Sequence, residues 1–329
     1  MADGSWTDGP DGHHDRRREL LARRDAQRRR IRRRRLLAGG ALLAVGLALA
    51  AVVLASALSS TDASNPTGGR RPTRGAGRGS TANVDGRAGA AGGSAGKPVR
   101  NATPQPDWEP HTGPVPILEY HELGPAPADA PYPELYVARP DFHREMDWLD
   151  GHGFQAVTLE AVERAWWHGG TLPPKPVVIS FDDGYRPQFT YALPELRRHG
   201  WPGVLNLKAE GSDLYESNVK AMIAAGWELA AHSINHLDLT TLDAATLEEE
   251  TAGARKILQR EYGVPVKDYC YPAGRFDPTV IAAVEAAGYA SATTEIPGYA
   301  SPGAPYELAR FEVLGSSGVS GVAADLASG

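Results

Sequence analysis

Apolar residues follow two different periodicities through the last two thirds of this chain. Short runs rich in Val, Ile and Leu, such as residues 115–120 and 177–181, have the length and composition of buried strands. Other segments have apolar residues three and four positions apart, as Phe142, Met146 and Leu149 do, and this spacing predicts amphipathic helices. The two kinds of segment alternate, so the sequence predicts an α/β fold with a parallel sheet.

The expected strands and helices together outline the architecture. We expect strands at residues 115–120, 154–159, 177–181, 204–207, 227–231, 266–271, 289–292 and 308–313, and helices at residues 140–151, 160–168, 187–199, 217–225, 244–262 and 278–287. Six or seven strand–helix units of this kind favour a compact, incomplete β/α barrel. A doubly wound open sheet is the alternative.

A long uncharged segment precedes this domain. Residues 36–58 contain no charged residue, and a helix of 23 residues at about 1.5 Å per residue crosses a hydrocarbon core of about 30 Å. Twelve arginines between residues 16 and 35 flank it, which favours a cytoplasmic tail at residues 1–35 and an extracytoplasmic C-terminal part. We therefore expect a single-pass membrane anchor. The alternative is a signal peptide cleaved at Ala55-Ser56-Ala57, which would make the protein secreted.

Composition divides the remainder at about residue 108. Residues 59–107 are rich in Gly, Ala, Ser, Thr, Pro and Arg, which predicts a flexible linker ahead of a folded domain at residues 108–329. Residues 1–107 carry 19 basic and 9 acidic residues, and residues 108–329 carry 15 and 31, so the domain has a net charge of −16. This charge argues against nucleic acid as a partner. Cys270 is the single cysteine and we expect a buried thiol; we expect the protein to be a monomer.

Polar residues that carry chemistry occur where four of the expected strands end. They are His121, the pair Asp182-Asp183, the pair His232 and His236, and the segment 272–275. In a β/α barrel the loops that follow the strands build the active site, so residues distant in sequence would meet at one end. The sequence therefore predicts an enzyme.

The two acidic residues and the two histidines form a candidate metal site. Neighbouring strand residues point to opposite sides, so one aspartate can bind a metal while the other faces water or substrate. His232 and His236 are four apart and would share one face of a helical turn. One carboxylate and two imidazoles leave a coordination position open, as catalytic zinc sites do, and cobalt or nickel can substitute. The alternatives are an Asp-Gly turn and two surface histidines.

These motifs resemble a known family. Ser-Phe-Asp182-Asp183-Gly, then His232-Ser-x-x-His236, then Tyr271-Pro-Ala-Gly is similar to the polysaccharide deacetylases of carbohydrate esterase family 4, the NodB-like domain. The resemblance covers residues 114–315 and implies a distorted (β/α) barrel of about seven strands. It also implies that Asp182 is the catalytic base, that Asp183 and the two histidines bind the metal, and that acetyl groups are removed from N-acetylglucosamine units.

The chain departs from that family's pattern in two places. Cys270 and Ala273 stand where the third motif usually has Arg and Tyr, so the arginine that orients the base is missing from its position, and Arg275 is the candidate replacement. The backbone N–H of Ala273 remains a candidate oxyanion donor. The late histidine acid is absent too, but Tyr120-His121 resembles the early element of circularly permuted members, including those that act on poly-β-1,6-N-acetylglucosamine. This resemblance makes His121 the expected general acid.

We therefore expect a zinc-dependent polysaccharide N-deacetylase, anchored in the membrane, with an acetylated polysaccharide as substrate. Tyr185 is a candidate for contact with the sugar, with core packing as its alternative role. A second hypothesis keeps the site but changes the substrate to O-acetyl esters of xylan or wall polymers. A third, from a different class, is a catalytically silent glycan-binding wall protein, because the third motif is altered.

Overall fold

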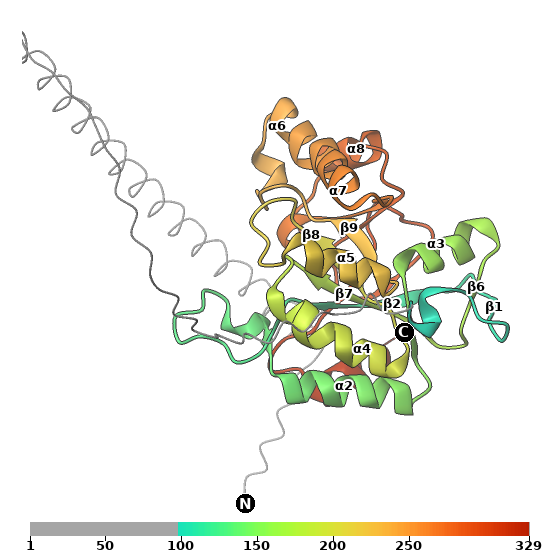
Figure 1. The fold of residues 1–329 in the computed structure, drawn as a ribbon. Helices are drawn as coiled ribbons and strands as arrows, with labels where there is room; N and C mark the ends of the chain where they lie inside the picture. Colours follow the sequence, from blue (N-terminus) through green and yellow to red (C-terminus); the bar gives the residue numbers. More distant parts are fainter. Residues whose placement is uncertain (1–97, 329) are drawn as a thin grey trace, which may run out of the picture. The chain divides into compact units, whose positions relative to one another are not determined.

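A curled parallel sheet forms the centre of the structure, a computed structural model that describes residues 98–328 (Figure 1). Seven of its strands follow one another around the curl, in the spatial order β11 (Ser291–Thr293), β10 (Asp268–Cys270), β9 (Glu228–Ala231), β8 (Val204–Leu207), β7 (Pro176–Asp182), β2 (Val115–Tyr120) and β13 (Phe311–Glu312). The predicted α/β class and the number of parallel strands are confirmed.

The segment 308–312 connects the two ends of this sheet. Thr293, at the end of β11, forms a parallel bridge with Leu308, and Leu308 donates its N–H to the carbonyl of Ala292 at 2.9 Å. Four residues later the same segment pairs with β2, where Glu312 is opposite Glu119. The sheet therefore curls back on itself, as a barrel does, and is not the doubly wound open sheet that was the alternative.

Strands β2 and β7 are neighbours in the sheet and are buried along their whole length. Their apolar residues pair directly, with Ile117 opposite Val178 and Leu118 opposite Ile179. A strand covered on both faces needs a continuous apolar run, and the sequences VPILEY and PVVISFD provide it. Shorter strands extend or flank the sheet: β5 (Gln155–Val157), β12 (Tyr299–Ala300), and the pairs β1 (Glu109–Pro110) with β6 (Thr171–Leu172) and β3 (Glu122–Leu123) with β4 (Tyr136–Val137).

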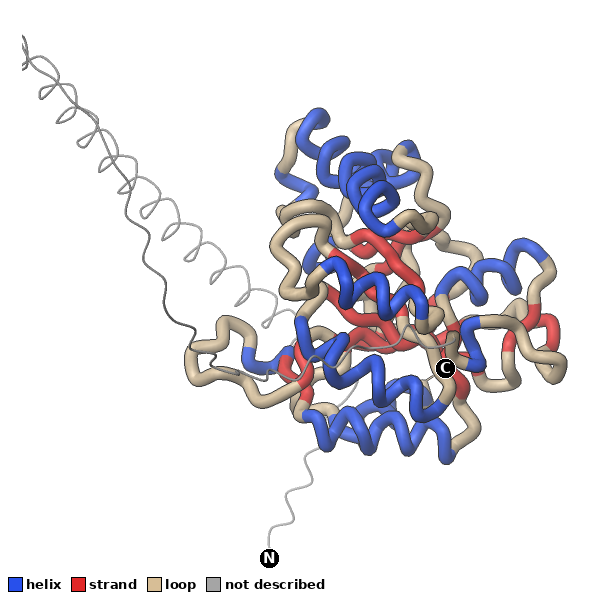
Figure 2. Tube along the Cα trace, viewed as in Figure 1, coloured by secondary structure: helices blue, strands red, loops and turns tan. Residues whose placement is uncertain are grey.

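Helices cover the sheet on its outside (Figure 2). They are α2 (Arg139–Gly151), α3 (Leu159–His168), α4 (Leu193–His199), α5 (Glu216–Ala224), α6 (Ala244–Glu248), α7 (Ala254–Tyr262), α8 (Pro278–Ala286) and α9 (Gly318–Leu326). Helices α2 and α4 lie side by side, and α6, α7 and α8 gather at the opposite end of the molecule (Figure 1). Local chemistry fixes some ends: Asp277 caps α8 by accepting from the N–H groups of Thr279 and Val280, and α3 ends at Gly169 in the left-handed region (φ 68°).

Two details differ from the sequence-based expectation. The helix expected at 244–262 is interrupted by a π-helical turn, Glu249–Gly253, and a similar turn, Gln188–Ala192, precedes α4. Helix α9 was not expected, because its sequence contains two glycines and little charge. Both π-helical turns carry residues of the candidate site, as π-bulges frequently do.

The folded part includes residues before Trp108. Val99 donates its N–H to the carbonyl of Ala225, and Asn101 is buried with its amide donating to the carbonyl of Ala156. Within residues 98–328 no helix is long and apolar enough to cross a membrane. The expected tail, anchor and most of the linker (residues 1–35, 36–58 and 59–97) lie outside the described residues.

Candidate active site

The ends of β2, β7, β9 and β10 bring the predicted residues together. Asp182 is the last residue of β7, His121 follows β2, and His232 follows β9. All of these strands run parallel, so their carboxyl ends meet at one edge of the sheet. The convergence predicted from the strand ends is therefore present in the structure.

Asp182 lies buried in a shell of hydrogen-bond donors. Arg310 donates through Nη1 to Oδ1 at 2.9 Å and through Nη2 to Oδ2 at 3.0 Å, a bidentate pair. Asn206, its neighbour on β8, donates to Oδ1 at 2.7 Å, and the Cys270 thiol donates to Oδ2 at 3.3 Å. These contacts fix the rotation of the carboxylate.

Arg310 is itself fixed from three sides. Its Nε donates to the carbonyl of Thr294 at 2.8 Å, its Nη1 lies 3.3 Å from the Ser180 hydroxyl, and its Nη2 lies 3.2 Å from the carboxylate of Glu119. Arg310, Glu119 and Asp182 are each at most 1% exposed. The buried guanidinium of Arg310 thus contacts two buried acidic side chains, Asp182 and Glu119.

The charges around Asp182 determine its protonation. Burial opposes its ionisation, but the Arg310 guanidinium, followed by His232 and His121, holds the pKa of Asp182 well below its usual range. Glu119 behaves in the opposite way: burial raises its pKa well above the usual value, although Arg310 acts to lower it. Asp182 is therefore an anion, whereas Glu119 is the member of the pair that holds a proton more readily.

Arg310 was missed by sequence reasoning, which proposed Arg275 for this role. In the structure Arg275 pairs with Asp238, and the guanidinium that grips Asp182 belongs to Arg310. Cys270 does occupy the site, buried as expected, and burial raises the pKa of its thiol well above the usual value. The sequence did contain one indication of this role: Arg310 is a charged residue within the largely apolar strand predicted at 308–313.

The backbone turns sharply after Asp182. Asp183 and Gly184 both adopt left-handed conformations (φ 73° and 76°), and Ser212 and Leu207 pack where a Cβ of Gly184 would lie. The Ser212 hydroxyl also donates to the Gly184 carbonyl at 2.9 Å. This turn directs the Asp183 side chain toward the two histidines.

His232 and His236 lie in a loop, so the expected turn of helix is wrong. Ser233 and His236 have left-handed backbones (φ 62° and 55°), and the Ser233 hydroxyl accepts from the His236 N–H at 2.8 Å. Glu250, on the π-helical turn Glu249–Gly253, accepts from the backbone N–H groups of Ile234 and Asn235 at 3.0 and 2.9 Å. This buried carboxylate holds the loop in shape.

The three predicted ligands fit a divalent metal. The Nε2 atoms of His232 and His236 lie 3.9 and 3.7 Å from Oδ1 of Asp183, and all three ligand atoms lie within 4.8 Å of one another. His232 is oriented through its other nitrogen, since Nδ1 lies 2.9 Å from the carbonyl of Cys270 and donates to it. That bond leaves the Nε2 lone pair for a metal. Burial also lowers the pKa of His232, which favours the neutral form that binds metals.

His121 shares one buried cluster with the expected base. One of its ring nitrogens lies within 4.8 Å of carboxylate oxygens of Asp182 and Glu119. Gln188 connects the backbones of the two candidates: its side-chain amide nitrogen, Nε2, donates to the carbonyl of Asp182 at 2.7 Å and to that of His121 at 2.9 Å. The expected acid and base are therefore placed by one buried side chain.

The remaining candidates lie around this centre. Ala273 follows β10 in a left-handed conformation (φ 55°), and its role as an oxyanion donor stays a prediction. Tyr185 follows the Asp183-Gly184 turn, and burial together with the Asp183 carboxylate raises its pKa. Contact between Tyr185 and a sugar also stays a prediction.

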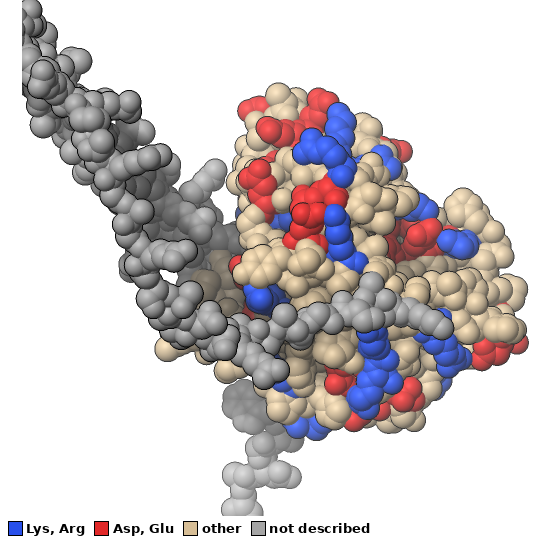
Figure 3. All heavy atoms as spheres, viewed as in Figure 1, with Lys and Arg blue, Asp and Glu red and all other residues tan. Residues whose placement is uncertain are grey.

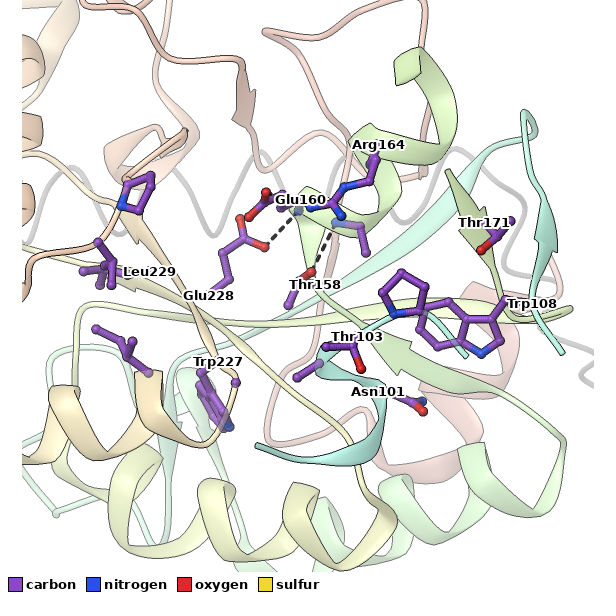
Figure 4. A pocket seen from close by; sticks show the side chains of 17 residues that line it. Asn101, Thr103, Trp108, Thr158, Glu160, Arg164, Thr171, Trp227, Glu228 and Leu229 are labelled. Carbon is purple, nitrogen blue, oxygen red and sulfur yellow. Dashed lines mark hydrogen bonds and ion pairs between the residues drawn. The ribbon is translucent and has the colours of Figure 1, made fainter. Parts of the chain in front are cut away.

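Two other features lie away from this centre. A surface cluster of His143, Asp147 and Glu195 has metal-like spacing, but Nη2 of Arg198 lies among these side chains and balances their charge. A cavity of about 220 Å³ opens near Glu228 at the amino end of β9, the opposite edge of the sheet from His232 (Figure 4). None of the predicted site residues lines this cavity.

Charges are mixed on the surface that Figure 3 shows, where basic side chains stand among acidic ones. No extended basic area interrupts this mixture on the visible part of residues 98–328. That the domain does not bind nucleic acid stays a prediction from its net charge.

Comparison with known proteins identifies the family. A family model described as "Polysaccharide deacetylase" matches residues 169–292. The protein YxkH of Bacillus subtilis (strain 168), whose name assigns it to the polysaccharide deacetylases, is 30% identical over 214 residues, which cover 64% of this chain and 74% of YxkH. The poly-beta-1,6-N-acetyl-D-glucosamine N-deacetylase of Escherichia coli (strain K12) is 34% identical over 95 residues, which cover 29% of this chain and 14% of that enzyme.

A solved structure gives the same fold. The Streptococcus pyogenes deacetylase PplD in complex with acetate superposes with a TM-score of 0.61 at 21% identity, covering 65% of this chain and 99% of that chain. The family model includes the Asp182-Asp183 strand end and the two histidines within the residues it matches. The chain belongs to the polysaccharide deacetylase family.

Proposed function

We propose that the protein is a metal-dependent deacetylase that removes acetyl groups from an N-acetylglucosamine-type polymer outside the cytoplasmic membrane. The main support for this proposal is that the adjacent residues Asp182 and Asp183 have different partners. Asp182 is held as an anion by Arg310, whereas Asp183 faces the two imidazole nitrogens. Similarity to a poly-beta-1,6-N-acetyl-D-glucosamine N-deacetylase supports the amide substrate.

The metal would be held by Asp183, His232 and His236, and zinc suits this set of nitrogen and oxygen donors. When bound, such an ion lowers the pKa of water and polarises a carbonyl oxygen. Asp182 accepts the proton of the attacking water, because Arg310 and Asn206 hold its carboxylate ionised and fixed. The bond from the acetyl carbon to the sugar nitrogen then breaks, and acetate and a free amine result.

His121 supplies the proton that the leaving nitrogen needs. It lies in the same cluster as Asp182, so acid and base act within one buried site. The N–H of Ala273 is the proposed donor to the oxyanion, and Tyr185 the proposed contact with the sugar. Residues 36–58 are the proposed anchor, which would place the catalytic domain outside the membrane.

An O-acetyl esterase on xylan or wall polymers is the second candidate. The same base and metal ligands serve both reactions, but an alkoxide leaves with less need for protonation than an amine does. His121, buried beside Asp182, therefore favours the amide.

The proposed function is tested by acetate release from the full-length chain on poly-N-acetylglucosamine, chitin oligomers, peptidoglycan and acetylated xylan, with and without a chelator. We expect release from an N-acetylated polymer, its loss with chelator and its recovery with zinc. Release from acetylated xylan alone would support the esterase instead. No release from any polymer by zinc-loaded protein would support the silent glycan-binding protein and contradict the proposal.

A further inference from the structure

The Asp183 carboxylate has a third neighbour besides the two histidines. Nζ of Lys208 lies 3.3 Å from Oδ1 of Asp183, closer than either imidazole nitrogen and on the same oxygen. Lys208 directly follows β8, and its side chain is 18% exposed. The structure therefore places an ammonium group at the oxygen that the metal would use.

We propose that Lys208 is a built-in counter-cation of the metal site, which holds Asp183 while the site is metal-free and must withdraw when the metal binds. The inference rests on the proposed function, because it requires the metal at Asp183. An ammonium group and a divalent ion repel each other, and both need the same carboxylate oxygen, so they compete for it. Lys208 consequently weakens the affinity of the site for its metal.

The backbone on either side explains why the ammonium stays close. Ala209 donates its N–H to the carbonyl of Ser233 at 3.0 Å, and Glu210 donates to that of Ile234 at 3.1 Å. The segment that carries Lys208 is thus bonded to the loop that carries both histidines. Its four-carbon stem can move while its Cα remains fixed at the edge of the site.

A place for the displaced ammonium is present beside the site. Nζ of Lys208 lies 5.8 Å from the centre of the Tyr185 ring, within the range of a cation–π contact. Tyr185 directly follows the turn at Asp183-Gly184. A small rotation of the lysine stem would therefore exchange the carboxylate for the aromatic face and open the coordination position.

The consequence is a site that is preorganised without metal but exchanges it readily. In the metal-free chain the Lys208 ammonium, 3.3 Å from Oδ1, compensates the charge of the Asp183 carboxylate. The Asp183 carboxylate is therefore already held beside the two imidazoles before a metal binds. The cost of this arrangement is a weaker affinity for the metal.

The test measures zinc affinity by competition with a chromophoric chelator in the full-length chain, with Lys208→Gln, Lys208→Met and Lys208→Arg. Removal of the charge should tighten zinc binding by about tenfold or more, whereas Lys208→Arg stays near the wild-type value. Lys220→Gln is the matched control, since Lys220 is exposed on α5 and pairs with Glu216. Metal-free Lys208→Gln should also unfold at a lower urea concentration than the wild type.

Two results separate this inference from the proposed function. Zinc affinity in Lys208→Gln and Lys208→Met that equals or falls below the wild-type value would overturn the inference, while loss of zinc in Asp183→Ala would still support the metal site. Zinc binding that Asp183→Ala leaves unchanged would instead contradict the metal site itself. A tightened affinity in Lys208→Gln that also appears in Lys220→Gln would reflect overall charge and would likewise overturn the inference.

Discussion

The guanidinium of Arg310 faces the carboxylate of Asp182 edge to edge, with Nη1 and Nη2 donating to Oδ1 and Oδ2 at 2.9 and 3.0 Å. The two residues are 128 positions apart in sequence. They meet because the segment 308–312 connects β11 to β2 and passes beside the end of β7. The arginine that orients the expected base thus comes from the segment 308–312, which joins the two ends of the sheet.

Replacing Arg310 should impair both catalysis and folding. In Arg310→Leu, we expect kcat for acetate release to fall by about 10²-fold or more, because Asp182 loses its orientation and its charge partner. The buried Asp182 carboxylate also loses its cation, which should lower the free energy of unfolding by about 3–5 kcal/mol. Zinc content should be unchanged, since Arg310 contacts no expected ligand among the described residues. Normal kcat in a folded Arg310→Leu would contradict this role.

Gln188 connects the backbones of the expected acid and base. In Gln188→Leu the carbonyls of Asp182 and His121 lose their donor, at a cost of about 1–3 kcal/mol for each buried group. We expect kcat to fall by roughly tenfold to a hundredfold as the two side chains shift, with KM little changed. Steady-state kinetics and urea unfolding measure the two effects. Thr190→Val, on the same π-helical turn but exposed, should leave both unchanged.

Glu250 should affect metal binding without being a ligand. It accepts from the N–H groups of Ile234 and Asn235, between the two histidines. In Glu250→Ala we expect zinc affinity to weaken by about 10- to 100-fold, as the loss of a group that orients metal ligands generally does. Glu249→Ala, its exposed neighbour, is the control. Equal zinc affinity in the two variants would argue against this role of Glu250.

The opposite edge of the sheet should make folding sensitive to pH. Burial, together with the neighbouring Asp268, raises the pKa of Glu163 on α3 to about 9. The folded state therefore binds this proton more tightly than the unfolded chain does, whose glutamate has a pKa near 4.5. Between these values the folded protein holds more protons, so the free energy of unfolding falls as pH rises, by up to about 1.4 kcal/mol per pH unit for one proton.

Urea unfolding of the full-length chain from pH 5.5 to 8.5 measures this slope. Glu163→Gln should show a distinctly smaller slope, because its amide does not ionise. Glu261→Gln, on α7 away from this cluster, should retain the wild-type slope. Identical slopes in wild type and Glu163→Gln would show that Glu163 is ionised in the folded state.

The chemistry at the strand ends could be predicted from the sequence because it depends on local patterns. Asp182-Asp183 ends a continuous apolar run, and His232 and His236 follow another. Arg310 could not be assigned in this way, since its role depends on the return of the chain from β11 to β2, a contact between distant segments. The spacing of His232 and His236 also led to a wrong prediction. A separation of four residues is typical of one helical turn, but Glu250 and residues with left-handed backbones hold this segment as a loop.

His121 distinguishes the two substrate classes. In His121→Ala we expect acetate release from an N-acetylated polymer to fall by about 10²-fold or more, because the leaving amine needs a proton. Release from an O-acetyl ester should fall much less. Initial rates on matched amide and ester substrates provide the comparison. An equal loss on both substrates would place His121 in a step other than protonation of the leaving group.

The division of work between Asp182 and Asp183 is tested most directly by Asp182→Asn, in which acetate release and bound zinc are measured on the same preparation. The account predicts wild-type zinc content and a rate at least about 10²-fold lower, since the amide cannot accept the proton of water. Asp183→Ala, measured in parallel, should lose the zinc. Acetate release at the wild-type rate by Asp182→Asn would contradict the account.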